Sequence, residues 1–202
     1  KYTVPRRVQD VIPITCIWPD GIFKLGGKFA KSFKFTDINY MVASREDKEN
    51  MFLTYSELLN SLDSGATTKI TIYNHKMNES YFEDSSLMPM QEDGRDEYRK
   101  EYNRMLLDKA VNADGVMQEK FITISIAKKS VEEARAYFAR IGADLQAHFA
   151  ALGSKCVELS ATERLRVLHD FYRAGEENYF TFDAKDMMKK GHDFRDYICP
   201  DS

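Results

Sequence analysis

The sequence predicts an α+β fold, with a ferredoxin-like (split βαβ) mixed sheet, helices packed on it, an N-terminal β-hairpin and a C-terminal tail. Two observations predict it. Segments with the two-residue period of strands alternate along the chain with segments whose apolar residues recur at helical spacing. Two strand–helix–strand units follow one another, at residues 28–73 and 119–159. Helices that connect strands are typical of sheets with helices packed on them.

The N-terminal segment is predicted to form the hairpin. Proline presets φ and glycine accepts a positive φ, so Pro19-Asp20-Gly21 has the chemistry of a turn between two short apolar segments. A further strand at 28–35 alternates between a phenylalanine-rich face, which Lys31 interrupts, and a face predicted to be wet. The two strands of the hairpin would be residues 14–18 and 22–24.

The first unit continues with a helix and a second strand. Ser44 and Asp47 have the spacing of a capping box, and Ser64-Gly65 ends the predicted helix. The strand at 66–73 places Ile70 and Ile72 on one face. The helix has a stripe of apolar residues, namely Met51, Tyr55, Leu58 and Leu62.

Between the two units, residues 74–92 are predicted to be loop with some helix. Residues 93–111 return to a helical pattern. The stripe of this second helix consists of Tyr98, Tyr102, Met105 and Leu106.

The second unit has the clearest patterns. The strand at 119–127 alternates isoleucines, which face inward, with Thr123 and Ser125, which face out. Ser130 and Glu133 form a capping box at the start of a helix whose apolar stripe continues to Phe149. A short strand is expected next, and then a helix, residues 155–159 and 160–171. Ser160 and Glu163 form the capping box of that last helix.

The domain assignment is residues 1–178 for the α+β domain and 179–202 for a connecting segment. Within the segment, residues 179–182 are expected to form a short strand. The tail as a whole is expected to lead into a further domain and to pack partly against it.

Composition excludes several classes of protein. The 43% hydrophobic share supplies a core, and the net charge of −3 lacks the basic excess typical of a dedicated nucleic-acid binder. No apolar run approaches the roughly 20 residues that cross a bilayer. Three cysteines without a CxxC motif indicate reduced thiols and a cytoplasmic protein. The chain begins with Lys1 instead of methionine, so a fragment of a larger protein is expected.

Motifs that bind nucleotides or metals are not matched. In residues 21–29 the lysine is one place late for a phosphate-binding loop and Phe29 replaces the hydroxyl, so a hairpin is the better reading. Residues 64–69 have a composition that suits phosphate binding, but a turn from helix to strand explains this composition better. Residues 112–115 are similar to part of a calcium loop, but the first and last ligand positions of that loop would be Ala110 and Phe121, which have no carboxylate. The four histidines have no zinc-site spacing. No catalytic, cofactor-binding or metal-binding residue is therefore predicted.

Two His-Asp pairs and a cysteine leave an enzyme as an open alternative. His169-Asp170 and His192-Asp193 are adjacent pairs, and adjacent residues on a helix point to different faces, so capping or surface hydrogen bonds are expected. His148, on a core-rich helix, is expected to be a structural residue at its edge. A small cytoplasmic enzyme using His192 or Cys199 is the hypothesis left open.

A series of sequence segments together resembles a known family, namely residues 35–40, 55–62, 101–106, 118–125, 133–138, 163–173 and 191–202. They resemble the region that precedes the motor in the ATPases of conjugative transfer, which are type IV secretion ATPases of the VirB type, from integrative elements and plasmids of Gram-positive bacteria. The resemblance covers nearly the whole chain and depends on the order and number of these segments.

The resemblance implies a function. The full protein would be a hexameric motor on the cytoplasmic face of the membrane, with ATP and Mg²⁺ bound in a RecA-like C-terminal domain outside this chain. This chain would be a non-catalytic docking and assembly domain that contacts inner-membrane channel components, neighbouring subunits and its own motor domain. The alternative is a nucleic-acid-contacting domain that guides the transferred single strand, since similar sheets bind RNA through exposed aromatic residues.

Overall fold

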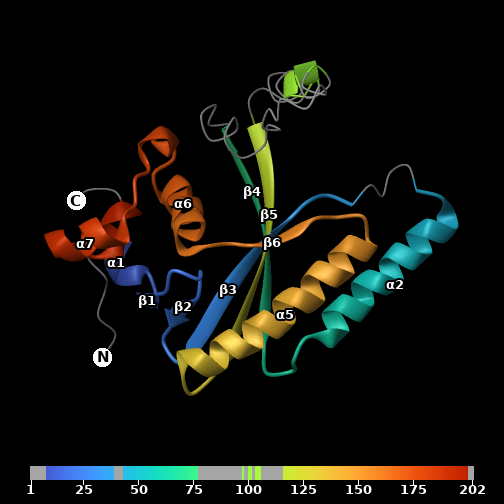
Figure 1. Cartoon of the computed structure of the whole chain (residues 1–202), viewed down its shortest axis with the longest axis horizontal. Coiled ribbons are helices and arrows are strands. Elements are labelled where there is room, and N and C mark those ends of the chain that lie inside the picture. Colours follow the sequence, from blue (N-terminus) through green and yellow to red (C-terminus); the bar gives the residue numbers. More distant parts are fainter. Residues whose placement is uncertain are drawn as a thin grey trace.

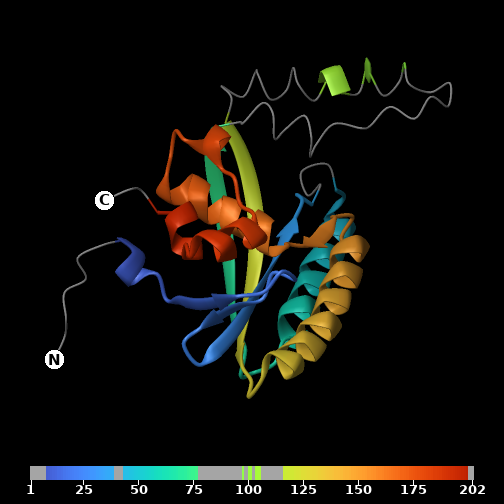
Figure 2. The ribbon, with the colours of Figure 1, turned by 60° about the vertical axis from the view of Figure 1, so that its left-hand side comes forward.

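In the computed structural model, a twisted sheet lies between two unequal helical layers (Figures 1 and 2). The structure describes residues 8–38, 43–76 and 116–199, with positions 97, 100, 101 and 103–105 between them. The helices α2 (Arg45–Ser61) and α5 (Val131–Ala151) cover one face of the sheet. The helix α6 (Ala161–Tyr172) lies on the other face, next to the C-terminal segment.

The described strands form one six-stranded sheet in which every pairing is antiparallel. The order is β1-β2-β3-β5-β4, and β6 also pairs with β3. β3 uses one edge for two partners, because Phe23 to Leu25 pair with its first residues and Cys156 to Glu158 with its last. The strands are β1 (Ile14–Ile17), β2 (Phe23–Leu25), β3 (Lys28–Phe35), β4 (Thr67–Lys76), β5 (Val116–Ala127) and β6 (Cys156–Glu158).

The α+β fold is confirmed. The predicted mixture of parallel and antiparallel strands is wrong, because the described strands pair only in antiparallel fashion. Each helix of the two units connects strands that are not neighbours: α2 joins β3 to β4, and β5 lies between them. The crossover therefore leaves room for an inserted antiparallel strand, and all adjacent pairs become antiparallel. The ferredoxin-like assignment stays a prediction.

The N-terminal hairpin forms as predicted, and its turn depends on Gly21. Gly21 has φ of +79°, and a Cβ atom there would lie 1.9 Å from the carbonyl oxygen of Leu159. A residue with a side chain would meet both backbone strain and a collision with backbone. Glycine is therefore required where the hairpin passes under the start of α6.

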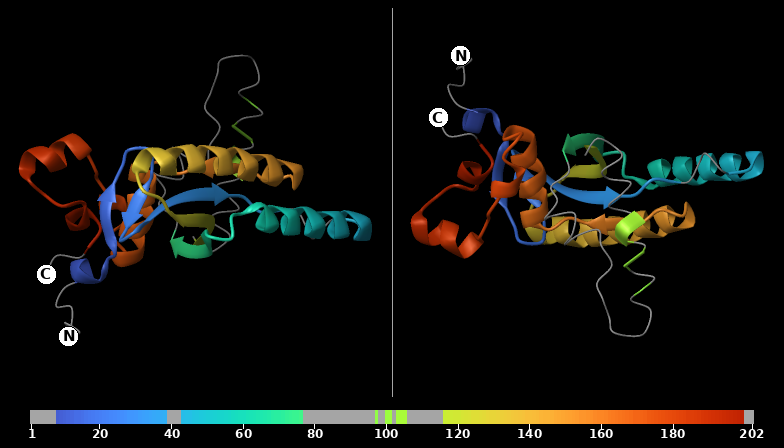
Figure 3. Two further views of the ribbon diagram at one scale, coloured as in Figure 1. Left: turned by 90° about the horizontal axis from the view of Figure 1, so that it is seen from below. Right: turned by 90° about the horizontal axis from the view of Figure 1, so that it is seen from above.

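The first helical layer contains the larger core. The Ser44–Asp47 capping box of α2 is confirmed, and Leu58 is its fully buried residue. α5 lies beside α2 (Figures 1 and 3) and packs its predicted stripe on the isoleucines of β5 and the phenylalanines of β3. At the start of α5 only half of the expected box forms, since Ser130 caps Glu133 N–H while the Glu133 carboxylate accepts from Lys129 N–H. The buried residues of the stripe are Ala134, Phe138, Ile141, Leu145 and Phe149.

The middle of the second face of β3 and β5 is covered, contrary to the prediction of a wet face, and Lys28 at the start of β3 stays exposed. Ala30 and Ser32 of β3 are buried, and Thr123 and Ser125 of β5 are half-buried beneath α6. The side-chain oxygens of Ser32 and Thr123 lie 2.8 Å apart and form a hydrogen bond. The predicted alternation of the two strands is present, but the sequence of a strand does not reveal that a later helix covers its polar face.

The C-terminal segment forms a second core with the hairpin and α6. The prediction of a short strand at residues 179–182 is wrong. Phe180 directly follows the 3-10 turn η1 (Glu177–Tyr179), and its side chain is buried in this core. The helix α7 (Ala184–Lys190) and the turn η2 (Phe194–Tyr197) follow, and at the other end of the chain lies α1 (Val8–Val11). Buried residues of this core are Ile12, Ile14, Phe23, Ala161, Leu165, Phe180, Phe194, Ile198 and Cys199.

Part of the predicted organisation lies outside the described residues. This includes most of the loop at 74–92, most of the helix at 93–111 and the candidate calcium turn at 112–115. The described positions between 97 and 105 are helical. The boundary between the domain and the connecting segment stays a prediction. No helix within the described ranges has the length and apolarity that crossing a bilayer would need.

Candidate functional site

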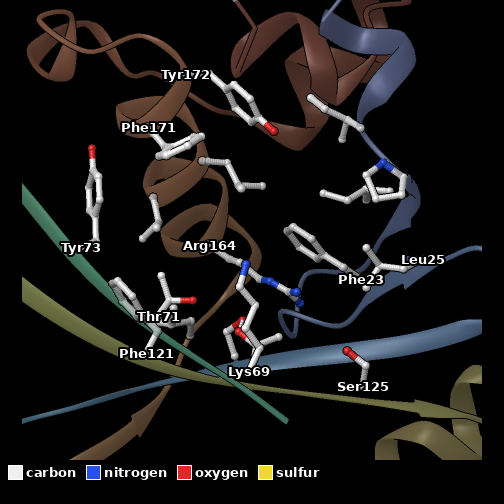
Figure 4. A pocket seen from close by; sticks show the side chains of 18 of the residues that line it. Phe23, Leu25, Lys69, Thr71, Tyr73, Phe121, Ser125, Arg164, Phe171 and Tyr172 are labelled. Carbon is white, nitrogen blue, oxygen red and sulfur yellow. Dashed lines mark hydrogen bonds between the residues drawn. The ribbon is translucent and has the colours of Figure 1, made fainter. Parts of the chain in front are cut away.

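A cavity of about 500 Å³ lies between the sheet and α6. Its floor is the face of β4 and β5 that points away from α5, its roof is α6, and its side wall is the hairpin with the residues before it (Figure 4). The walls are mostly apolar, and the volume is within the range of small-molecule sites, roughly 300–1,000 Å³. Lining residues that carry the argument below are Phe23, Lys69, Tyr73, Thr123, Arg164 and Phe171.

Strand alternation explains the floor of the cavity. Lys69 pairs with Thr123 and Thr71 pairs with Phe121 in the β4–β5 ladder, so these four side chains share one face. Ile70 and Ile72 occupy the opposite face of β4, as predicted, but they remain 45% and 59% exposed. The edge strand therefore turns its polar residues and Tyr73 toward the cavity and leaves its isoleucines at the surface.

Helical spacing explains the roof. Arg164, Leu168 and Phe171 are separated by four and three residues, so they lie on one face of α6. This face looks down on the sheet, and Phe171 reaches Tyr73 of β4, with ring centroids 6.4 Å apart. Phe171 is still 63% exposed, which places it at the rim of the cavity.

Arg164 is the polar centre of the cavity wall. Its Nη1 donates hydrogen bonds to the carbonyl oxygens of Ala30, at 2.7 Å, and Gly21, at 3.1 Å, and its guanidinium carbon lies 4.0 Å from the centre of the Phe23 ring. Burial lowers the pKa of this guanidinium to about 9, because removal from water disfavours the charged form. It is still a cation at neutral pH. Through Nη1 of Arg164, α6 is therefore hydrogen-bonded to both the hairpin turn and β3.

A charged cluster around Glu119 lines a smaller pocket next to the cavity, and the two share Phe121 and Val167. Glu119 of β5 forms an ion pair with Lys34, whose Nζ lies 2.5 Å from the carboxylate. Nε2 of His75 lies 3.2 Å from the same carboxylate, which is an ion-pair distance when the histidine is protonated. Burial alone would raise the pKa of Glu119, but the bond with His75 and the charge of Lys34 outweigh it and hold the pKa below its usual value. Glu119 is therefore a carboxylate whose charged form is stabilised by the charge of Lys34 and by the bond with His75.

The buried His169–Asp170 pair corrects the surface placement that was expected. Nδ1 of His169 lies 3.0 Å from Oδ1 of Asp170, and both residues are buried. Burial raises the pKa of Asp170, although the bond with His169 opposes the change. His169 also packs on the ring of Phe180, at 5.1 Å between centroids, so the pair sits where the C-terminal segment meets α6.

The other candidate residues do not come together as a catalytic site. His148 bonds to the backbone oxygen of Asp144 within α5, as expected of a structural histidine. His192 is exposed and lies 3.5 Å from Asp196, whereas Cys199 is buried with a pKa raised by burial. A buried thiol of raised pKa is a poor nucleophile.

The glycine-rich segments also take the structures predicted for them. Residues 21–29 are turn and hairpin, and residues 64–66 form the turn from α2 to β4. All three cysteines are free thiols. Within the described ranges, no group of three or more His, Cys, Asp or Glu side chains is arranged to hold a metal ion.

Neither of the two cavity cations, Arg164 and Lys69, was predicted as a site residue. A signal for Arg164 was present, because it shares the helical face of Leu168 and Phe171, where a charged residue interrupts an apolar stripe. Lys69 had no such signal, since alternation on an edge strand does not say which face meets another element. No protein-family model matches the chain, and no curated protein sequence matches it significantly.

Proposed function

We propose that this chain is a non-catalytic docking and assembly domain of a conjugative-transfer ATPase. In this proposal the domain binds an inner-membrane channel component at the cytoplasmic face and contacts neighbouring subunits of a hexamer. ATP and Mg²⁺ would bind in a motor domain encoded further along the same reading frame. The sequence segments that together resemble this family, in their order along the chain, support this proposal.

The observation that carries the proposal is the free edge of the sheet. β4 is ten residues long and ends the strand order, and no strand within the described ranges pairs with its outer edge. Ile70 and Ile72 are exposed beside this edge. Long edge strands with exposed apolar residues are sites where another chain adds as a strand. We assign this edge to an extended segment of the channel component.

A second exposed apolar surface supports a role in assembly. On α2, Phe52 is 68% exposed and Leu53 is 59% exposed, and Leu59 follows Phe52 by seven residues, so it lies on the same side of the helix. Apolar side chains that gather on a surface are typical of protein–protein contacts. This surface suits the contact with a neighbouring subunit.

The gene provides the first test. The reading frame should continue beyond residue 202 into a GxxxxGK[ST] segment, because a transfer ATPase needs a phosphate-binding loop. A stop codon directly after residue 202 in the native gene would overturn the assignment to this family.

A binding measurement provides the second test. In the full-length ATPase, Ile70→Lys with Ile72→Lys should weaken binding of the purified channel component at least tenfold. Val157→Lys, an exposed apolar position on β6, is the matched control and should leave binding unchanged. Equal binding by the wild type and the double variant would exclude this edge as the docking site.

A further inference from the structure

The cavity beneath α6 contains two cations without a matching carboxylate. Arg164 enters from the roof and Lys69 extends from the floor (Figure 4). No Asp or Glu is among the described residues that line this cavity. The lining itself therefore carries cationic groups only, which favours an anion between Arg164 and Lys69. The carboxylates of Glu119 and Asp170 line the smaller neighbouring pocket.

Arg164 keeps donors available for a ligand. Its two bonds to Gly21 and Ala30 both use Nη1, and no described residue accepts a bond from Nε or Nη2. A guanidinium presents several N–H groups in one plane and suits the two oxygens of a carboxylate or phosphate. A structural role in joining α6 to the hairpin uses only part of this side chain.

Lys69 is an exposed side chain on the edge strand, at the floor of the cavity. No described residue forms an ion pair or hydrogen bond with its ammonium group, although it lies on the cavity side of β4. At the same rim Lys28 donates to Thr67, a lining residue, at 3.2 Å. Three cationic side chains therefore lie in or beside the cavity.

The rest of the lining selects the body of the ligand. Phe23, Leu25, Phe121, Val167 and Leu168 line the space around the two cations. Such walls favour a hydrocarbon or aromatic group, since transfer of apolar surface from water stabilises the complex. A fully polar anion would leave these walls without a partner.

We propose that this cavity binds a small amphipathic anion, in which a carboxylate or phosphate group on an apolar body meets Arg164 and Lys69. The chemistry is shared by free fatty acids and by single-chain lipid phosphates. This inference is independent of the proposed docking function, because it concerns the opposite face of β4 from Ile70 and Ile72.

Calorimetric titration of the intact chain with three probes tests the proposal. Decanoate and decyl phosphate offer the two acidic groups on the same alkyl chain, and 1-decanol offers the chain without charge. We expect at least one of the anions to bind at least tenfold more tightly than decanol. Binding of decanoate alone would indicate a carboxylate ligand, and binding of decyl phosphate alone would indicate a phosphate headgroup.

Substitutions place the binding in the cavity. Lys69→Gln should weaken binding of the anion about tenfold without loss of folding, since its ammonium group has no partner within the described part of the chain. Lys155→Gln, an exposed lysine outside the cavity lining, is the charge-matched control and should bind as the wild type does. Arg164→Gln should also lose binding, with folding checked by circular dichroism because its two backbone bonds are lost as well.

Several results would overturn the proposal. One is no binding of either anion, and another is equal binding of decanol and the anions. A third is unchanged affinity in Lys69→Gln. Binding of single-stranded oligonucleotides that depends on Lys69, without binding of decanoate or decyl phosphate, would also overturn it and would favour a nucleic-acid surface.

Discussion

Lys31 of β3 and Glu158 of β6 form an ion pair beside α5, with Nζ and Oε2 2.5 Å apart and the Glu158 side chain 39% exposed. Lys31 interrupts the phenylalanine face of its strand and is only 7% exposed. Glu158 lies against Gly142 of α5, where an added Cβ would be 2.6 Å from the carboxylate. The lysine that looked out of place in the sequence thus has a partner from a strand 127 residues later.

Removal of Glu158 should destabilise the fold. Glu158→Ala leaves the Lys31 ammonium buried without its partner, which should lower the free energy of unfolding by about 2 kcal/mol. Lys31→Met combined with Glu158→Ala should recover most of this loss. Urea unfolding at pH 7 measures both, and Glu49→Ala, from an exposed pair with Arg45, should change stability by less than about 0.5 kcal/mol. A double variant as unstable as the single one would contradict the account.

Gly21 should not tolerate a side chain. Gly21→Ala combines a positive φ with a collision against the Leu159 carbonyl oxygen, and should cost at least about 3 kcal/mol. Gly27→Ala is the matched control, because nothing lies within 4 Å of its added Cβ, and it should cost less than about 1 kcal/mol. Thermal unfolding of the two variants provides the comparison, and similar melting temperatures would show that the turn adapts.

Stability should fall in acid in a way that depends on Glu119. The pKa of this group lies below its usual value of 4.5, so below pH 4.5 the unfolded chain takes up the proton more readily than the folded chain. Its stabilising contribution is present above that pH and is lost as the pH falls further. Glu119→Gln should differ most from the wild type at pH 7 and converge with it in acid. A constant difference from pH 7 to pH 3, measured by urea unfolding, would exclude this role.

The three thiols should react in a defined order. Cys16 is half-buried, Cys156 is buried with a pKa raised to about 11 by burial and the nearby Glu158, and Cys199 is also buried. Iodoacetamide at pH 8 should therefore modify Cys16 first, and the other two only after urea is added. Mass spectrometry of timed samples gives the order. Modification of Cys199 before Cys16 in the native protein would revive the hypothesis of a reactive thiol.

Local chemistry was sufficient to predict most of the helices and strands. The Ser44–Asp47 and Ser160–Glu163 boxes start α2 and α6, and the isoleucines of β5 face the core, because caps and alternation act between residues close in the sequence. The strand expected at residues 179–182 failed for the opposite reason. Phe180 is buried against the hairpin and α6, so its conformation depends on residues far away in the chain.

The sequence by itself determined the α+β class and the positions of the main elements, since these depend on periodicity and capping. Only the tertiary structure decided what the polar faces of β3, β4 and β5 meet. Placement of α6 over those faces brings Arg164 above Lys69 and Thr123, which are separated from it by 95 and 41 positions, and encloses the cavity. A pattern along one segment describes which residues share a face, but burial and electrostatic potential depend on the segment that packs against that face.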